Sequence, residues 1–165
     1  MYNNHASLSN ALPSDLLEGL RSMLVLDDDG LSQLANASSS IKEMLADLNW
    51  AGFYLFKQGQ LVLGPFQGKP ACIRITLDKG VCGKAAREQR SVRIDDVHLF
   101  PGHIACDAAS RSELVVPLVK EGKLLGVIDL DSPNLARFSL SDQEFMEQVG
   151  HLLVQHVHWE HFQLG

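Results

Sequence analysis

Residues 113–131, "ELVVPLVKEGKLLGVIDLD", decide the fold. Two apolar runs flank a turn around "KEGK" at 120–123, and this arrangement is typical of an antiparallel hairpin. Both runs are apolar on both faces along most of their length, as expected of strands that lie in the middle of a sheet. The stretch therefore predicts the central hairpin of a sheet that is covered on both sides.

Acidic residues interrupt this hairpin. Asp129 and Asp131 lie two positions apart, so a strand would place both carboxyls on one face. Such pairs often serve only to solvate a strand end, but acids in so apolar a strand need water, a cationic partner or a ligand. Whether Glu113 lies on the same face as these aspartates depends on the hairpin turn. A two-residue loop pairs Glu113 with Leu130 and points it away from them, whereas a three-residue loop with a bulge pairs it with Asp131. An acidic pocket of three carboxyls requires the second register.

The rest of the chain predicts helices around further strands. Two helical patterns before residue 49 are separated by "DDDG" at 27–30, and strand-like runs begin at "WAGFYLF", residues 50–56. A short helix is expected at "GVCGKAAREQ", and a final helix follows a capping box at Ser141 and Glu144, with Leu140 and Phe145 as its staple. Further strands are expected at 61–66, 72–77 and 91–94, with an irregular segment at 95–112. This order predicts an α+β fold, with helices packed on an antiparallel sheet of about six strands.

Three cysteines, at 72, 82 and 106, are too far apart for a close metal-ligand pair. Cys72 begins an apolar run and Cys82 opens the short helix, so burial and reactivity are both open for these two thiols. Cys106 lies in the long irregular segment, where no apolar pattern requires a small buried residue. Long loops on a rigid scaffold often carry function, so Cys106 is the candidate reactive thiol.

Aromatic residues provide candidate walls for a site. Trp50 and Tyr54 fall on one face of a strand, and Gly52 between them leaves space between the rings. From the spacing alone, core packing is the better explanation. Two rings beside several carboxyls would suit a small zwitterion with an apolar end.

The histidines are weaker candidates. Those at 151, 156, 158 and 161 are expected along the C-terminal helix, where contact with the helix dipole or solvation explains them better than a metal site does. His98 and His103 lie near Cys106, and either could tune its thiol. A solvated loop histidine is the more common case.

Composition limits the classes of function. A chain of 165 residues with 45% apolar residues and a net charge of −6 is expected to form one domain, residues 1–165. It lacks the basic clusters that nucleic acid binding requires, so nucleic acid is not an expected partner. It also lacks a secretory signal and an apolar run of membrane-spanning length, so we expect a cytoplasmic protein with no membrane contact.

Several strings in order resemble one known family. They are "NWAGFYL", "LVLGPFQGKPACIRI", "DKGVCGKA", "DVHLFPGHIACDAAS", "SELVVPL" and "GVIDLDSP". Together they are similar to the free methionine-(R)-sulfoxide reductases, which are GAF-domain enzymes, over about residues 30–150. The resemblance implies a GAF-like sheet with the terminal helices on one face and loops plus a short helix over the other.

The resemblance also implies an activity and a set of residues. It implies reduction of free L-methionine (R)-S-oxide to L-methionine, thioredoxin as the electron donor, no metal or organic cofactor, and a homodimer. Cys106 corresponds to the catalytic cysteine, and Cys72 and Cys82 correspond to the cysteines available for resolution. The sequence leaves open which of the two resolves Cys106, and we favour Cys72. The substrate pocket corresponds to Trp50, Tyr54, Glu113, Asp129 and Asp131.

The residue types suit this chemistry on independent grounds. A thiolate is suited to attack sulfur, and a sulfoxide oxygen leaves poorly unless it is protonated. Closely grouped carboxyls cannot all ionise, so one of the three acids should keep a proton at neutral pH and could deliver it. We place Glu113 and Asp129 in the catalytic set with the cysteines, and the sequence leaves open which carboxyl is the donor.

Overall fold

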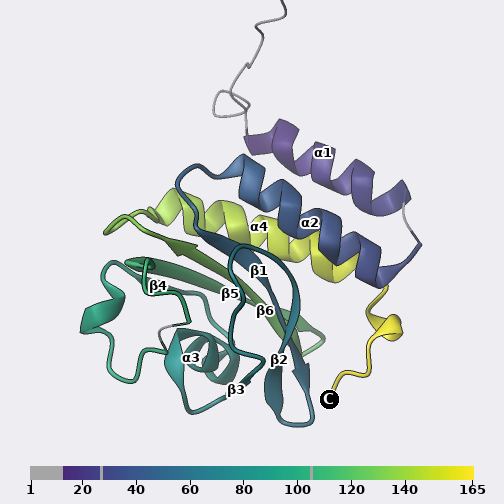
Figure 1. Cartoon of the computed structure of the whole chain (residues 1–165). Coiled ribbons are helices and arrows are strands. Elements are labelled where there is room, and N and C mark those ends of the chain that lie inside the picture. Colours follow the sequence, from purple (N-terminus) through teal and green to yellow (C-terminus); the bar gives the residue numbers. More distant parts are fainter. Residues whose placement is uncertain (1–12, 27, 105) are drawn as a thin grey trace, which may run out of the picture.

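The computed structural model describes residues 13–26, 28–104 and 106–165 (Figure 1). Its centre is a six-stranded antiparallel sheet in the order β3-β2-β1-β6-β5-β4. The strands are β1 Trp50–Lys57, β2 Gln60–Gln67, β3 Arg74–Thr76, β4 Val92–Ile94, β5 Ser112–Lys120 and β6 Lys123–Ser132. The predicted central hairpin is therefore β5 and β6, and the prediction of an α+β fold is confirmed.

The helices form separate layers on the sheet. Helices α1 (Pro13–Leu26), α2 (Gly30–Met44) and α4 (Leu140–His156) lie on one face, and α3 (Gly80–Glu88) lies on the other (Figure 1). Each layer buries its own apolar cluster against the sheet, one under the three long helices and a smaller one under α3. This arrangement is the one that the resemblance implies. No helix in the described ranges is long and apolar enough to cross a membrane.

The central hairpin combines the turn of one predicted alternative with the register of the other. Lys120 pairs with Lys123, so the loop has two residues, Glu121 and Gly122, with φ values of 51° and 76°. A shift between Leu118 and Val119 then leaves one extra residue on β6. Glu113 consequently pairs with Asp131. The prediction that a two-residue loop would pair Glu113 with Leu130 was wrong, because a bulge inside the strand changes the register as effectively as a longer turn.

Two boundaries also differ from the sequence prediction. Helix α4 begins after Ser139, whose hydroxyl accepts from the N–H of Asp142 while the Asp142 carboxylate accepts from the N–H of Ser139. The predicted capping box at Ser141 and Glu144 was therefore two residues too late, and Leu140 is 58% exposed rather than part of a staple. A further contact favours the earlier start, because Arg137 lies 3.1 Å from the same Asp142 carboxylate. Strand β3 is shorter than predicted and begins two residues after Cys72.

The C-terminal histidines do not all lie on α4. His158 and His161 follow it, around a short 3-10 helix at Trp159–His161. The Nδ1 atom of His161 accepts from the first N–H of α2, at Gly30, over 3.0 Å. His161 therefore helps to join the tail to α2.

Candidate active site

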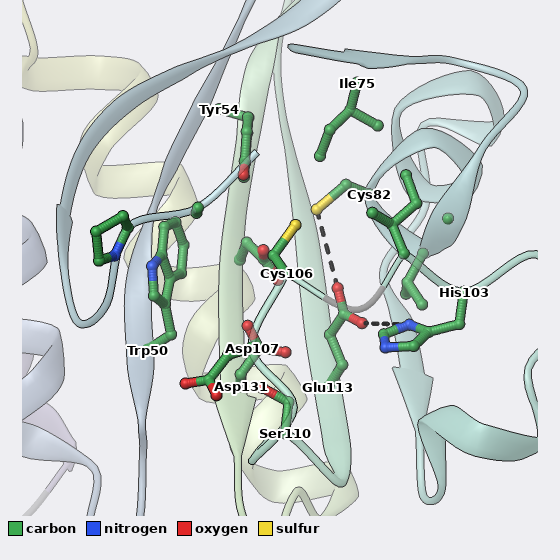
Figure 2. A pocket seen from close by; sticks show the side chains of 16 residues that line it. Trp50, Tyr54, Ile75, Cys82, His103, Cys106, Asp107, Ser110, Glu113 and Asp131 are labelled. Carbon is green, nitrogen blue, oxygen red and sulfur yellow. Dashed lines mark hydrogen bonds and ion pairs between the residues drawn. The ribbon is translucent and has the colours of Figure 1, made fainter. Parts of the chain in front are cut away.

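An acidic pocket lies on the α3 side of the sheet, where β5 and β6 run side by side. Glu113 is paired with Asp131, and Asp129 lies two residues back on β6, so all three acids line the same cavity. Figure 2 labels Glu113 and Asp131 in this cavity. Glu113 is 5% exposed and Asp129 is 7% exposed. The structure therefore brings together the three acids that the sequence singled out, by way of the bulge in β6.

Stacked aromatic rings form one wall of this pocket. The rings of Trp50 and Tyr54 lie 6.0 Å apart between centroids, and Phe66 on β2 also stacks with Trp50, at 5.2 Å between centroids. A Cβ atom at Gly52 would lie 2.3 Å from the Cβ of Phe66. Gly52 therefore admits the neighbouring strand, and the prediction that it leaves space between the rings was wrong.

Two of the cysteines form a disulfide at the pocket. Cys72 and Cys106 are bonded, with 5.9 Å between their Cα atoms, which is an ordinary separation. Cys106 is exposed and lines the pocket, whereas Cys72 is half-buried and its carbonyl accepts from the Tyr54 hydroxyl at 2.9 Å. The structure thus pairs the candidate nucleophile with Cys72.

Cys82 stays a free, buried thiol at the start of α3. Its Sγ lies 3.9 Å from Glu113 Oε1, so it contacts the acidic pocket rather than the disulfide (Figure 2). Burial and the charges of Asp129 and Glu113 raise its pKa well above the ordinary value. Cys82 is therefore in its thiol form at neutral pH, which makes it a poor nucleophile.

The electrostatics of the pocket favour protonated carboxyls. Burial, followed by the charges of Asp129 and Asp131, raises the pKa of Glu113 well above its usual range. Burial likewise raises the pKa of Asp129, to about 6. Asp131 also has a raised pKa because of burial and the charges of Asp129 and Asp107. The pocket thus holds at least one proton at neutral pH, as the sequence predicts for closely grouped acids.

His103 faces Glu113 on the remaining side of the pocket. Its Nδ1 atom lies 3.9 Å from Glu113 Oε2 (Figure 2). Burial, followed by the charge of His98, lowers the pKa of His103, so the ring is neutral at neutral pH. His98 itself is exposed and contacts Asp96 at 3.2 Å. The structure therefore places His103, but not His98, among the pocket residues.

The segment that carries Cys106 is attached to the sheet by a residue that the sequence analysis missed. The side-chain amide of Asn49 donates to Asp107 Oδ2 and to Ser110 Oγ, each over 3.0 Å. Asp107 also accepts from the N–H of Ala109 at 2.9 Å, which forms a tight turn directly after Cys106. Asn49 precedes Trp50 at the start of β1, and its own N–H donates to the carbonyl of Asp131. It therefore ties the cysteine-bearing segment to the acids.

Asn49→Ala is expected to loosen this segment without unfolding the sheet. The substitution leaves the buried Ser110 hydroxyl and the Asp107 carboxylate without their shared donor, which typically costs about 1–3 kcal/mol. We expect a lower midpoint in urea unfolding and slower closure of the Cys72–Cys106 disulfide in the reduced protein exposed to peroxide. Asn134→Ala, on an exposed loop, is the matched control. Wild-type closure in Asn49→Ala would contradict the expectation.

Two groups of side chains in the described ranges could in principle hold a metal ion. One is Cys82, Glu113 and Asp129 in the pocket, and the other is His158, Glu160 and His161 in the tail. The pocket group is the same set of side chains whose raised pKa values favour the protonated forms, and protons compete with a metal for such ligands. In the tail, one His161 nitrogen already accepts from Gly30, and His158 Nδ1 lies 2.8 Å from Glu160.

Comparison with known proteins gives the family. A GAF-domain family profile matches residues 33–158. The free methionine-R-sulfoxide reductase of Escherichia coli is 48% identical over 136 residues, which cover 82% of this chain and 82% of that protein. The chain belongs to this family. The resemblance drawn from the sequence is confirmed.

Solved structures of family members agree with this assignment. The free methionine-R-sulfoxide reductase of Neisseria meningitidis, determined in complex with its substrate, matches with a TM-score of 0.86 and 36% identity, and the match covers 96% of this chain and 95% of that one. The reduced form of fRMsr of Staphylococcus aureus matches with a TM-score of 0.85 and 40% identity, covering 95% and 99%. The architecture is thus shared over almost the whole chain.

Proposed function

We propose that this protein reduces free L-methionine (R)-S-oxide to L-methionine with its own thiols as the reductant. The observation that carries the proposal is the disulfide between Cys72 and Cys106, formed at the edge of a pocket with three carboxyls. Disulfide formation is the oxidised end point of thiol-dependent sulfoxide reduction. The buried acids supply the proton that the reaction needs.

The proposed reaction has two steps. The Cys106 thiolate attacks the sulfoxide sulfur, and a protonated carboxyl donates to the oxygen, so that methionine leaves and Cys106 carries that oxygen as a sulfenic acid. The Cys72 thiol then attacks the Cys106 sulfur and expels water. The substrate gains two electrons and the two thiols lose two. We propose Glu113 as the donor, because it is buried and its pKa is raised well above the usual range, whereas the pKa of Asp129, about 6, leaves that carboxyl largely ionised at neutral pH.

The pocket suits a small amino acid. We propose that the stacked rings of Trp50 and Tyr54 contact the apolar end of the substrate, and that the charge left on Asp129 and Asp131 binds its ammonium group. The solvent space in the disulfide-bonded form is only about 40 Å³, enough for a few water molecules. Substrate therefore enters the reduced form, after Cys106 has separated from Cys72. Cys82 is a contact of Glu113 in this scheme, and not the resolving cysteine.

Turnover requires an external reductant for the disulfide. We propose thioredoxin, and accordingly a reducing compartment such as the cytoplasm. A homodimer stays a prediction of the resemblance. It is supported by exposed apolar side chains at the junction of α1 and α2, namely Val25, Leu26 and Leu31.

One further candidate has support from the same disulfide. A thiol-based redox sensor on a GAF scaffold would form the Cys72–Cys106 bond with peroxide and would need no small substrate. Such a sensor would yield no methionine. A product assay therefore separates the two functions.

The decisive experiment compares four substrates with the reduced protein. We expect methionine from free methionine (R)-sulfoxide, and little from the free (S)-sulfoxide or from either peptide-bound sulfoxide. In our proposal the reduced pocket encloses the whole amino acid, and its acids require a free ammonium group. Methionine is measured by chromatography with excess dithiothreitol as the reductant. Equal rates on free and peptide-bound substrate would contradict the proposed role of the acids.

A further inference from the structure

The disulfide lies next to an edge of the sheet. Cys72 lies two residues before the start of β3, and β3 is the first strand in the sheet order, so only one of its two sides is paired. On the inner side, the carbonyl of Ile73 accepts from the N–H of Leu63 over 2.9 Å, and Leu61 pairs with Ile75. Backbone groups of an antiparallel strand alternate in direction. Arg74 therefore directs its N–H and C=O away from the sheet.

The side chain beside Cys72 is apolar and exposed. Ile73 is 70% exposed, which places it among seven large apolar side chains that are exposed in the described part of the chain. A single exposed isoleucine is ordinary on a protein surface. Ile73 is distinguished by its position, because it is bonded to a cysteine of the disulfide and lies at an unpaired sheet edge.

A protein reductant must bind close to this surface. To break the Cys72–Cys106 bond, a thiolate of the reductant must come within bonding distance of one of its sulfurs, about 2 Å. A folded dithiol protein that reaches so close must also cover the residues around the bond. Exposed sheet edges bind partner backbone by strand addition, and apolar side chains beside the edge add affinity.

We propose that Cys72–Arg74 is the docking surface for the protein dithiol that recycles the enzyme. Ile73 packs on an apolar surface of the reductant, and the outer edge at Arg74 pairs with its backbone. This docking surface depends on the proposed function in one respect only, which is that a protein must reduce the disulfide. Small dithiols need neither contact, so they serve as an internal reference.

The redox step is an ordinary thiol–disulfide exchange. A reductant thiolate attacks one sulfur of the Cys72–Cys106 bond, which breaks as a mixed disulfide forms and the other cysteine leaves as a thiol. The second reductant thiol then attacks the reductant sulfur of the mixed disulfide. The reductant leaves as a disulfide, and Cys72 and Cys106 are both thiols again. Two electrons and two protons move from the reductant to the enzyme.

The test compares a protein dithiol with a small one on the Ile73→Glu variant. Thioredoxin, kept reduced by its reductase, is one reductant and dithiothreitol is the other. We expect the rate constant for reduction by thioredoxin to fall about tenfold, as for loss of one apolar contact at an interface. Reduction by dithiothreitol should stay within about twofold of wild type. Ile73→Ala should give a smaller loss with thioredoxin alone.

Leu140→Glu provides the matched control, because Leu140 is 58% exposed at the start of α4, on the opposite face of the sheet. It should change neither rate. Reduction is followed as thiols released from the purified oxidised protein, so the result does not depend on sulfoxide turnover. An unchanged thioredoxin rate in Ile73→Glu would overturn the docking surface, and so would an equal loss with both reductants. Failure of the proposed activity would instead be seen as absence of methionine with dithiothreitol.

Discussion

Cys106→Ser is expected to abolish reduction of free methionine (R)-sulfoxide while leaving the fold intact. A serine hydroxyl cannot attack sulfur as a thiolate does, and the variant cannot form the Cys72–Cys106 bond. Loss of a nucleophile typically lowers the turnover rate by roughly 10⁴-fold or more. Methionine formation with excess dithiothreitol measures the loss. The exposed position of Cys106 makes the substitution mild for stability, which circular dichroism and urea unfolding check.

Cys72→Ser is the informative partner variant. It keeps the nucleophile but lacks the thiol that closes the disulfide. Without an external thiol, each reduced molecule should therefore form one methionine and then stop as a sulfenic acid. A dimedone label on Cys106 should appear in step with that single equivalent. Cys82→Ser should still form the Cys72–Cys106 disulfide, because Cys82 is free in this structure. Retained turnover in Cys106→Ser would falsify the proposed nucleophile.

The fold was predictable where one periodic pattern decided it. The hairpin of β5 and β6 and the long helices follow from runs of apolar residues, whereas the face of the sheet on which the short helix lies was implied only by the family resemblance. The register of the hairpin did not follow. Sequence reasoning placed the irregularity in the turn, whereas the extra residue lies inside β6, beyond Leu124. A bulge of this kind depends on packing along the whole strand pair and leaves no local sequence signal.

The site was predictable where residue type and spacing sufficed. The three acids and Cys106 stood out because polar or reactive residues interrupt apolar patterns or lie in a long loop. Asn49 did not stand out, because an asparagine before a strand is common. Its importance comes from two hydrogen bonds to Asp107 and Ser110, about 60 residues away in sequence. Contacts of that range are set by the tertiary fold, which residue spacing does not reveal.

Asp129→Asn is expected to make the protein less active and more stable. Burial raises the pKa of Asp129 from 3.8 to about 6. The native state therefore binds the proton more tightly than the unfolded chain does. As pH rises from about 4 to about 6, the unfolded state loses its proton first, and the free energy of unfolding falls. Above pH 6 the full penalty applies, on the order of a few kcal/mol.

Asparagine has nearly the same shape and no charge, so it removes this penalty. At pH 7 the variant should unfold at a higher urea concentration than wild type, and the gain should disappear below about pH 4, where both side chains are neutral. Asp107→Asn is a control for which the expected change in stability has the opposite sign. Hydrogen bonds from Ala109 and Asn49 lower the pKa of Asp107, which means that they stabilise its ionised form. Replacing this carboxylate by an amide should therefore destabilise the protein at pH 7.

The activity of Asp129→Asn should decrease. Loss of the Asp129 carboxyl removes a charged contact to the substrate ammonium, worth about 1.5–3 kcal/mol, so kcat/KM should fall roughly 10- to 100-fold. A variant that is both less active and less stable at pH 7 would mean that Asp129 is held ionised by partners in the native state. The opposite changes in stability and activity are expected because the site keeps an ionised acid in an apolar sheet, and the ammonium group of a bound substrate compensates the burial of that charge.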